Sequence, residues 1–308
     1  MLIILQNFKF RFFLINVIFN DFSHQLHFLV HAWLTLSITD SPFWVGAVFG
    51  LHGLGMVMFS IFAGVLVDTI DRRKLIVVSQ LIHALMSFVL AILIFYGQIQ
   101  LWHMLIIGFG YGAVASISMP ATMTLTLDIV GRDKLLSGVA ITFAVGSFMA
   151  IISPVIGSRT VDTLGIEWVY ILISISLVIA ALMMTFIRDL TPIPKRNTSP
   201  LHDMKTGLNY AMTPPAVRIL LIMNLVTASM GWSHDSMLSV MARDVLKVGV
   251  SGLGYMIAIA SLGGTIATLL VSNQPYIKEK AKLLLGGLVA FGVFLIIFSL
   301  SRWFPLSL

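Results

Sequence analysis

The chain has 308 residues and a formal net charge of +6, and it is 58% hydrophobic but only 10% charged, with a mean hydropathy of +0.99. These values exclude a soluble domain, whose apolar fraction is about one half and whose charged fraction is about a quarter. The chain contains no cysteine, which excludes disulfides, thiolate metal sites and cysteine nucleophiles. We therefore expect an all-α polytopic membrane protein.

Nine apolar windows follow one another along the chain. A helix needs about 20 apolar residues to cross about 30 Å of hydrocarbon. The windows are 12–37, 44–67, 75–96, 101–127, 135–157, 167–187, 217–241, 252–271 and 283–301. Residues 1–11 lack the pattern of a cleavable signal peptide, so we expect the first span to act as its own insertion signal.

The basic residues are distributed unequally between the two sides of these spans. If the N-terminus is cytoplasmic, 15 of the 19 Lys and Arg residues fall in segments on the cytoplasmic side. This asymmetry predicts a cytoplasmic N-terminus. It also explains the net positive charge without a nucleic-acid-binding patch, so we expect no nucleic-acid partner.

The first span is unusually polar for a transmembrane helix. At about 100° per residue, His24, His27 and His31 share an arc of about 60°, with Asp21 and Gln25 beside it. Such a face lines a water-filled cavity or binds neighbouring helices. Since histidine titrates near physiological pH, these five residues are candidates for substrate contact and proton coupling. The alternative is that they are hydrogen-bonded between helices or lie in interfacial water. The histidines also have helical metal-ligand spacing, but without cysteine or a nearby glutamate we expect no metal site.

A dense charge cluster separates the second and third windows. Five of the seven residues from Asp68 to Lys74 are charged, and unpaired ions are costly in hydrocarbon. The stretch therefore predicts a tight aqueous turn between two spans. Gly64, four residues before Asp68, is expected to give its helix a face for close approach.

This turn resembles the signature loop between the second and third helices of the major facilitator superfamily, G-x-x-x-D-[RK]-x-G-[RK]-[RK]. Gly64, Asp68, Arg72 and Arg73 match the motif, whereas Thr69 and Asp71 depart from it. This variant of the loop, which ends in Asp-Arg-Arg, resembles the loop of the bacterial exporter branch that includes siderophore and macrolide efflux proteins. The resemblance implies two helical bundles, alternating access, and a cytoplasmic charge cluster made of Asp68, Arg72 and Asp128.

The fourth and fifth spans carry small residues and a proline. Gly108, Gly110 and Gly112 predict a small-residue face for close helix packing. Pro154 and Gly157, within Ser153-Pro154-Val155-Ile156-Gly157, look like the end of the Gly-Pro-x-x-Gly motif of the exporters. A kinked packing helix without any meaning for transport direction is the alternative reading.

A linker at 189–216 divides the chain into two groups of spans. It is rich in proline and basic residues, and its apolar residues recur at helical spacing, which predicts a short amphipathic helix on the cytoplasmic membrane face. We therefore predict a six-helix bundle over 1–188, the cytoplasmic linker over 189–216, and an incomplete three-helix bundle over 217–308.

The second group repeats the first at an offset of 208 residues. Asp71-Arg72-Arg73-Lys74-Leu75 aligns with Glu279-Lys280-Ala281-Lys282-Leu283, as expected of a duplicated transporter. The seventh span carries Asn224, His234 and Asp235 as further candidates for substrate or coupling, and Asp235 aligns with His27. The second copy stops before its fourth span, so the sequence supplies about nine of the twelve helices that the resemblance implies. We expect either a truncated chain or one that needs help to form a closed two-domain structure.

No phosphate-binding loop, G-x-S-x-G elbow or H-E-x-x-H motif is present, so we expect no enzyme activity. We predict a secondary transporter of the bacterial inner membrane that exports a small amphipathic molecule by proton-coupled alternating access. Its partners would be that small molecule, protons and the lipid bilayer, with no cofactor. Two alternatives remain open: a transport-inactive fragment, and a membrane-embedded enzyme or sensor that uses the histidine-rich first helix.

Overall fold

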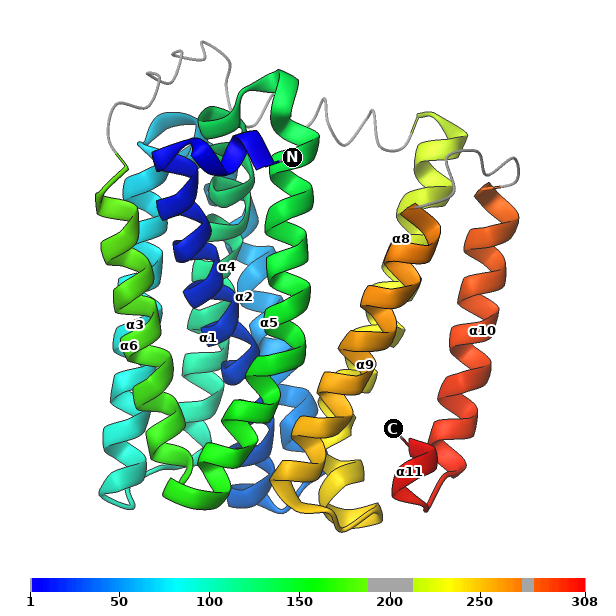
Figure 1. Ribbon diagram of the computed structural model, residues 1–308. Coiled ribbons are helices and arrows are strands. Elements are labelled where there is room, and N and C mark those ends of the chain that lie inside the picture. The colour runs from blue at the N-terminus through cyan, green and yellow to red at the C-terminus, as the bar shows by residue number, and fades with distance from the viewer. Residues whose placement is uncertain (1, 188–212, 273–279, 308) are drawn as a thin grey trace.

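The computed structural model describes residues 2–187, 213–272 and 280–307 (Figure 1). Each of the nine predicted windows coincides with one long helix, most to within a few residues. The helices are α1 (Phe8–Thr39), α2 (Pro42–Thr69), α3 (Arg72–Phe95), α4 (Leu101–Val130), α5 (Leu135–Leu164), α6 (Ile166–Thr185), α8 (Pro215–Val240), α9 (Gly249–Ser272) and α10 (Lys280–Leu300). Four short elements complete the described residues, which include no strand: η1 (Leu2–Gln6), η2 (Arg132–Lys134), the π-helical η3 (Met241–Val245) and α11 (Phe304–Ser307). The all-α polytopic fold is confirmed.

Six helices of the described chain have stretches long and apolar enough to cross a membrane. They are Pro42–Ser60, Arg72–Phe95, Leu101–Val130, Arg132–Leu164, Ile166–Thr185 and Gly249–Leu270. The shorter stretch Leu285–Leu300 of α10 is also apolar. α1 is not among the six, although it has 32 residues, because its histidine, amide and carboxylate side chains lower its hydropathy.

Short turns make successive helices run in opposite directions. Asp40 ends α1 in the left-handed region with a φ of 52°, and α2 begins two residues later at Pro42, whose ring suits a first helical turn. Only Ile70 and Asp71 separate α2 from α3, and the Asp71 carboxylate accepts a hydrogen bond from the Arg73 amide at 2.9 Å. In Figure 1 the α2–α3 turn and the N-terminus lie at the top, which we call the signature end; the α1–α2 turn and η3 lie at the distal end.

Glycines let α2 and α4 pack closely. A Cβ atom at Gly55 would collide with the Phe109 carbonyl oxygen, and one at Gly112 would collide with the His52 carbonyl oxygen. Gly108 faces α2 as well, whereas a Cβ at Gly110 would lie 2.7 Å from Met86 of α3. The single small-residue face that we predicted is therefore wrong: a residue two positions away lies about 200° around the helix.

Buried amide side chains link α1 to α3 and α6. The Asn16 amide donates to the Gln80 oxygen at 3.0 Å and to the Ala180 carbonyl at 2.7 Å. Gln80 in turn donates to Asn20 at 3.3 Å. Hydrogen bonds of this kind contribute about 0.6 kcal/mol each between membrane helices, and together they stabilise the α1, α3 and α6 packing.

Of the second group of helices, α9 packs along α5, whereas α8 contacts α1 and α2. A Cβ at Gly254 of α9 would collide with the Ser158 hydroxyl oxygen and would lie 2.6 Å from the Pro154 carbonyl oxygen. On another side of α5, Gly157 leaves room for the Leu26 side chain of α1. Figure 1 shows α5 and α9 side by side near the distal end and diverging toward the signature end. Pro154 and Gly157 thus lie where α5 contacts both groups.

Helix boundaries agree with the predicted repeat. α2 begins at Pro42 and α9 at Gly249, 207 residues later. The predicted amphipathic helix of the linker lies outside the described residues. The three-part division of the chain stays a prediction.

Candidate functional site

Four histidines from three helices surround one tyrosine of α4. His27 and His31 lie one turn apart on α1 and are each 3% exposed, and their rings stack with centroids 4.6 Å apart. The rings of His27 and His83, the latter from α3, both lie parallel to Tyr111 at 3.7 Å and 8°. Two rings cannot occupy the same face at that distance, so His27 and His83 sandwich Tyr111. His52 of α2 is the fourth member, with its ring 6.4 Å from Tyr111.

Hydrogen bonds fix the ring of His31. Its Nε2 lies 3.3 Å from the Met104 carbonyl oxygen and its Nδ1 lies 3.2 Å from the Tyr170 hydroxyl. Because a carbonyl only accepts, Nε2 carries the proton and donates, and Nδ1 accepts from Tyr170. His83 likewise donates from Nε2 to the Tyr111 carbonyl at 3.1 Å. These bonds hold both rings in defined orientations.

A small cavity lies beside this cluster, between α1, α2 and α4. It offers about 10 Å³ for the centre of a water molecule, which is close to the room that one water needs. Its walls are His27, Phe28, His31, Val48, Phe49, His52 and Gly108. The Nδ1 atom of His27 is buried and has no hydrogen-bond partner among the described residues. A buried polar atom left in this way costs about 1–3 kcal/mol, so a water in the cavity would stabilise the site.

The other predicted residues of α1 lie apart from this cluster. His24 is exposed and its ring packs on Phe28 at 4.7 Å, and Gln25 is half-buried. Asp21 is half-buried and faces α5, where a Cβ at Gly146 would lie 3.0 Å from its carboxylate. The residues of the predicted arc therefore lie in three different environments: the histidine cluster, the exposed surface beside Phe28, and the contact of α1 with α5.

The candidates on α8 are described only in part. His234 is half-buried, with its ring edge-on to Phe291 and Phe298 of α10 at 6.2 and 6.3 Å. The side chains of Asn224 and Asp235 lie outside the described residues. The predicted juxtaposition of Asp235 with His27 stays a prediction.

The signature loop is tied to the ends of α4 and α6. Arg72 forms an ion pair with Asp128, and their side chains are 14% and 18% exposed. Arg73 donates to the Ile187 carbonyl at 2.6 Å. The expected meeting of Asp128 with this loop is thus present, and Asp68 lies half-buried in the last turn of α2. The close approach that we expected at Gly64 is absent, because nothing among the described residues lies within 4 Å of a Cβ there.

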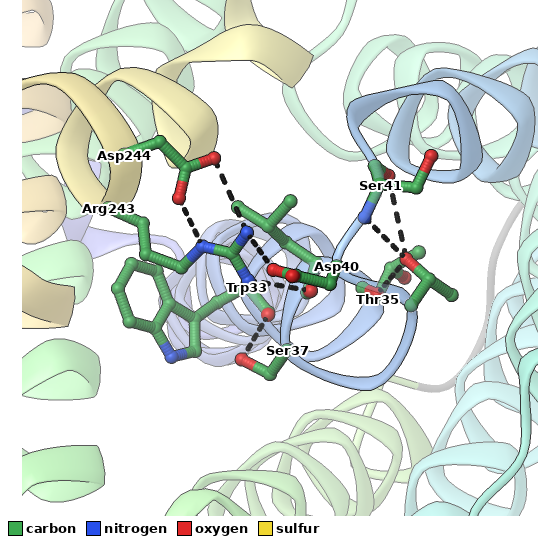
Figure 2. A network of polar contacts seen from close by, with 9 residues as sticks. Trp33, Thr35, Ser37, Asp40, Ser41, Arg243 and Asp244 are labelled. Atoms are coloured by element: carbon green, nitrogen blue, oxygen red, sulfur yellow. Dashed lines mark hydrogen bonds and ion pairs between the residues drawn. The ribbon is translucent and has the colours of Figure 1, made fainter.

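A second charged network, at the distal end, was missed by the sequence analysis. Figure 2 shows Arg243 of η3 reaching the end of α1, where it donates to the Leu36 carbonyl at 2.8 Å and to Asp40 at 2.6 Å. It also donates to the neighbouring Asp244 at 2.6 Å. The hydrogen bond with Asp244 and the pairing with Asp40 raise the pKa of Arg243, which keeps the guanidinium charged. The only feature of the sequence that could have indicated this network was that Arg243 falls on the side of the predicted spans that has few basic residues.

Two more polar contacts join α5 to α9 at the same end. The Arg159 guanidinium donates to the Tyr255 hydroxyl at 2.6 Å and lies 5.6 Å from the centre of that ring. Ser251 donates to the Asp162 carboxylate. Together with Arg243 they link the first six helices to the later helices at the distal end.

Comparisons with known proteins agree with this architecture. A family model described as transmembrane secretion effector matches residues 2–306. The chain is 26% identical over 262 residues to the enterobactin exporter EntS of Escherichia coli O139:H28 (strain E24377A / ETEC), and equally to that of Escherichia fergusonii. The match covers 83% of this chain and 62% of each relative, so the chain spans under two thirds of their length.

Solved structures resemble the chain in fold. Two crystal structures of a bacterial homolog to the human lysosomal transporter Spinster, inward-facing and either unoccupied or occupied, match with a TM-score of 0.69 and 14% identity. They cover 97% and 98% of this chain, which covers 70% and 69% of theirs. Given the family match over nearly its whole length, the chain belongs to the transmembrane secretion effectors of the major facilitator superfamily.

Proposed function

We propose that this chain acts in proton-driven export of a small amphipathic molecule across the bacterial inner membrane by alternating access. The observation that carries the proposal is the position of the contacts between its two groups of helices. Arg243, Arg159 and Ser251 make those contacts at the distal end. This is the arrangement expected of one end state of a carrier whose halves rock against each other.

Orientation supports loading from the cytoplasm. The Lys and Arg asymmetry supports a cytoplasmic position for the signature end. With the distal contacts closed, a substrate would then enter from the cytoplasmic side, as export requires. The α2–α3 turn would lie at that entrance, where Arg72 pairs with Asp128.

The distal contacts have the chemistry of a reversible closure. The Asp40 side chain is 88% exposed, so breaking its pair with Arg243 leaves both charges accessible to water. Exposed ion pairs contribute only about 0.2–1 kcal/mol, so this pair itself adds little to the free energy that opening requires. Tight buried pairing at this position would oppose the cycle.

Proton coupling is supported by the histidines that are gathered in the first six helices. Histidine is the side chain whose charge changes most readily near physiological pH. Ionisable groups inside a membrane protein are costly and mark ion or substrate paths. The substrate class follows the relatives, which are named as enterobactin exporters, so we propose a siderophore-like or similar amphipathic molecule.

Flux measurements in everted membrane vesicles carrying this 308-residue chain test the proposal. We expect an imposed pH gradient to drive uptake of a catecholate siderophore or of one compound in an amphipathic dye panel. Collapsing the gradient with an ionophore should abolish uptake, and vesicles without the chain give the background. Binding of a compound without gradient-driven movement would overturn export as the activity of this chain and favour the transport-inactive alternative.

A further inference from the structure

The cavity between α1, α2 and α4 combines three features that suit a charged ligand of minimal size. Its volume of about 10 Å³ leaves room for one water and for no organic molecule. His27 and His52 stand on its walls, and Nδ1 of His27 is buried without a partner among the described residues. These features suit a proton held with a single water.

Tyr111 gives His27 a surface on which a positive charge is stabilised. The two rings are parallel at 3.7 Å, so an imidazolium at His27 would lie over the electron-rich face of the phenol. The His83 ring covers the opposite face of Tyr111 at the same spacing. His83 thus acts as a positioning residue that keeps the phenol ring fixed beneath His27.

The other members of the cluster are less available to a proton. His31 already uses both ring nitrogens, one toward Met104 and one toward Tyr170. His83 donates to the Tyr111 carbonyl and does not border the cavity. His52 borders the cavity and can share the water with His27.

The neighbouring titratable groups limit the site to one charge. The titratable groups around His27 are His31 on α1, His52 on α2, His83 on α3 and Tyr111 on α4, and His24 lies one turn earlier on α1. Tyr170 of α6 binds His31, and the Asp21 carboxylate faces α5. Because the His31 ring stacks at 4.6 Å, a second imidazolium beside His27 would be repelled strongly.

We propose that this cavity is the proton-binding site, that His27 takes up one proton through a water shared with His52, and that Tyr111 stabilises the resulting cation. The proton adds to an imidazole nitrogen of His27 on loading and leaves it on release, so the cluster alternates between neutral and singly charged. Its role in transport depends on the proposed function, whereas proton uptake by His27 does not.

Nitrogen NMR of the purified 308-residue chain, labelled at its eight histidines and held in lipid nanodiscs, tests the site directly. On lowering the pH from neutral to the onset of acid unfolding, we expect one cluster imidazole to become an imidazolium with a single-site curve. His27→Gln should remove that signal. His103→Gln, at the start of α4 and outside the cluster, should leave the curve unchanged.

The possible outcomes separate the two proposals. If His27 stays neutral while another cluster histidine titrates, or if two cluster imidazoles charge together, the assignment is wrong. If His52→Gln leaves the His27 curve unchanged, the shared water is wrong. Should His27→Gln fail to fold, the wild-type spectra still show whether His27 becomes charged. His52→Gln removes the His52 signal and Tyr111→Phe changes the signals of the rings around it, and together they identify the signal of His27. Titration of His27 without flux in vesicles refutes the proposed function alone, and gradient-driven flux with a silent His27 refutes this site alone.

Discussion

Replacing Arg243 by alanine should open the distal end of the molecule. The substitution removes two contacts to α1: the charged hydrogen bond to the Leu36 carbonyl at 2.8 Å and the ion pair with Asp40 at 2.6 Å. The contact with Asp244 is local to η3 and is expected in both open and closed states, so its loss cancels. The change therefore acts on the equilibrium between states.

The magnitude follows from the exposure of each partner. A hydrogen bond from a charged donor contributes about 1.5–3 kcal/mol. Since Asp40 is 88% exposed, its pair adds only about 0.2–1 kcal/mol. The closed state should lose about 2 to 4 kcal/mol, which corresponds to a shift of about 30-fold or more in the ratio of closed to open molecules.

Pulsed electron paramagnetic resonance between two spin labels measures this shift. The chain has no cysteine, so labelling sites can be introduced at Ser41 and Val245 without first removing others. Arg243→Ala should add a longer distance to the distribution across the distal end. Arg302→Ala, which alters an exposed arginine near the end of α10, is the matched control and should change nothing. An unchanged distribution in folded Arg243→Ala would refute the assignment of Arg243 to closure.

Two further substitutions test the packing and the signature end. Gly112→Ala places a Cβ against the His52 carbonyl oxygen and should destabilise the protein by about 1–3 kcal/mol in thermal unfolding. Gly53→Ala should not, because no described residue lies within 4 Å of a Cβ there. Equal unfolding temperatures for the two variants would contradict the close α2–α4 approach. Asp128→Asn removes the charge that pairs with Arg72 and should cost about 1 to 2 kcal/mol in the same assay, because both side chains are largely buried. Stability equal to that of the unsubstituted chain would show that this pair contributes nothing.

The sequence predicted features that depend on neighbouring residues and missed those that depend on distant ones. The lengths of the apolar windows predicted the nine long helices, and the resemblance to a known loop motif predicted that Arg72 and Asp128 lie in one charge cluster. Helical periodicity gave the angles of His24 and His27 on α1, but it carried no information on which helix would cover each of them. The partner of Arg243 at Asp40 is 203 residues away, and no local pattern joins the two.

The same limit applies to the histidine cluster. His52 and His83 are each the only histidine of their helix, and no local pattern joins one to the other, so only the packing of α2 and α3 against α4 brings them to Tyr111. Gly64 is the opposite case, because its motif was recognised and yet its Cβ position meets no other residue in the part of the chain that the structure describes. A motif gives the identity of a residue, whereas its contacts depend on the conformation that the protein adopts.

The close contact at Gly254 provides a point about which α9 could rotate relative to α5. At this glycine, near one end of a 24-residue helix, the α9 backbone lies too close to α5 to leave room for a Cβ atom. From Gly254 to Ser272 the helix extends about 27 Å at 1.5 Å per residue, so a rotation of about 10° about the contact displaces the far end by about 5 Å. That displacement exceeds the diameter of a water molecule. Replacing Gly254 by alanine would therefore push α9 away from α5 at this contact and change how far the other end of α9 moves.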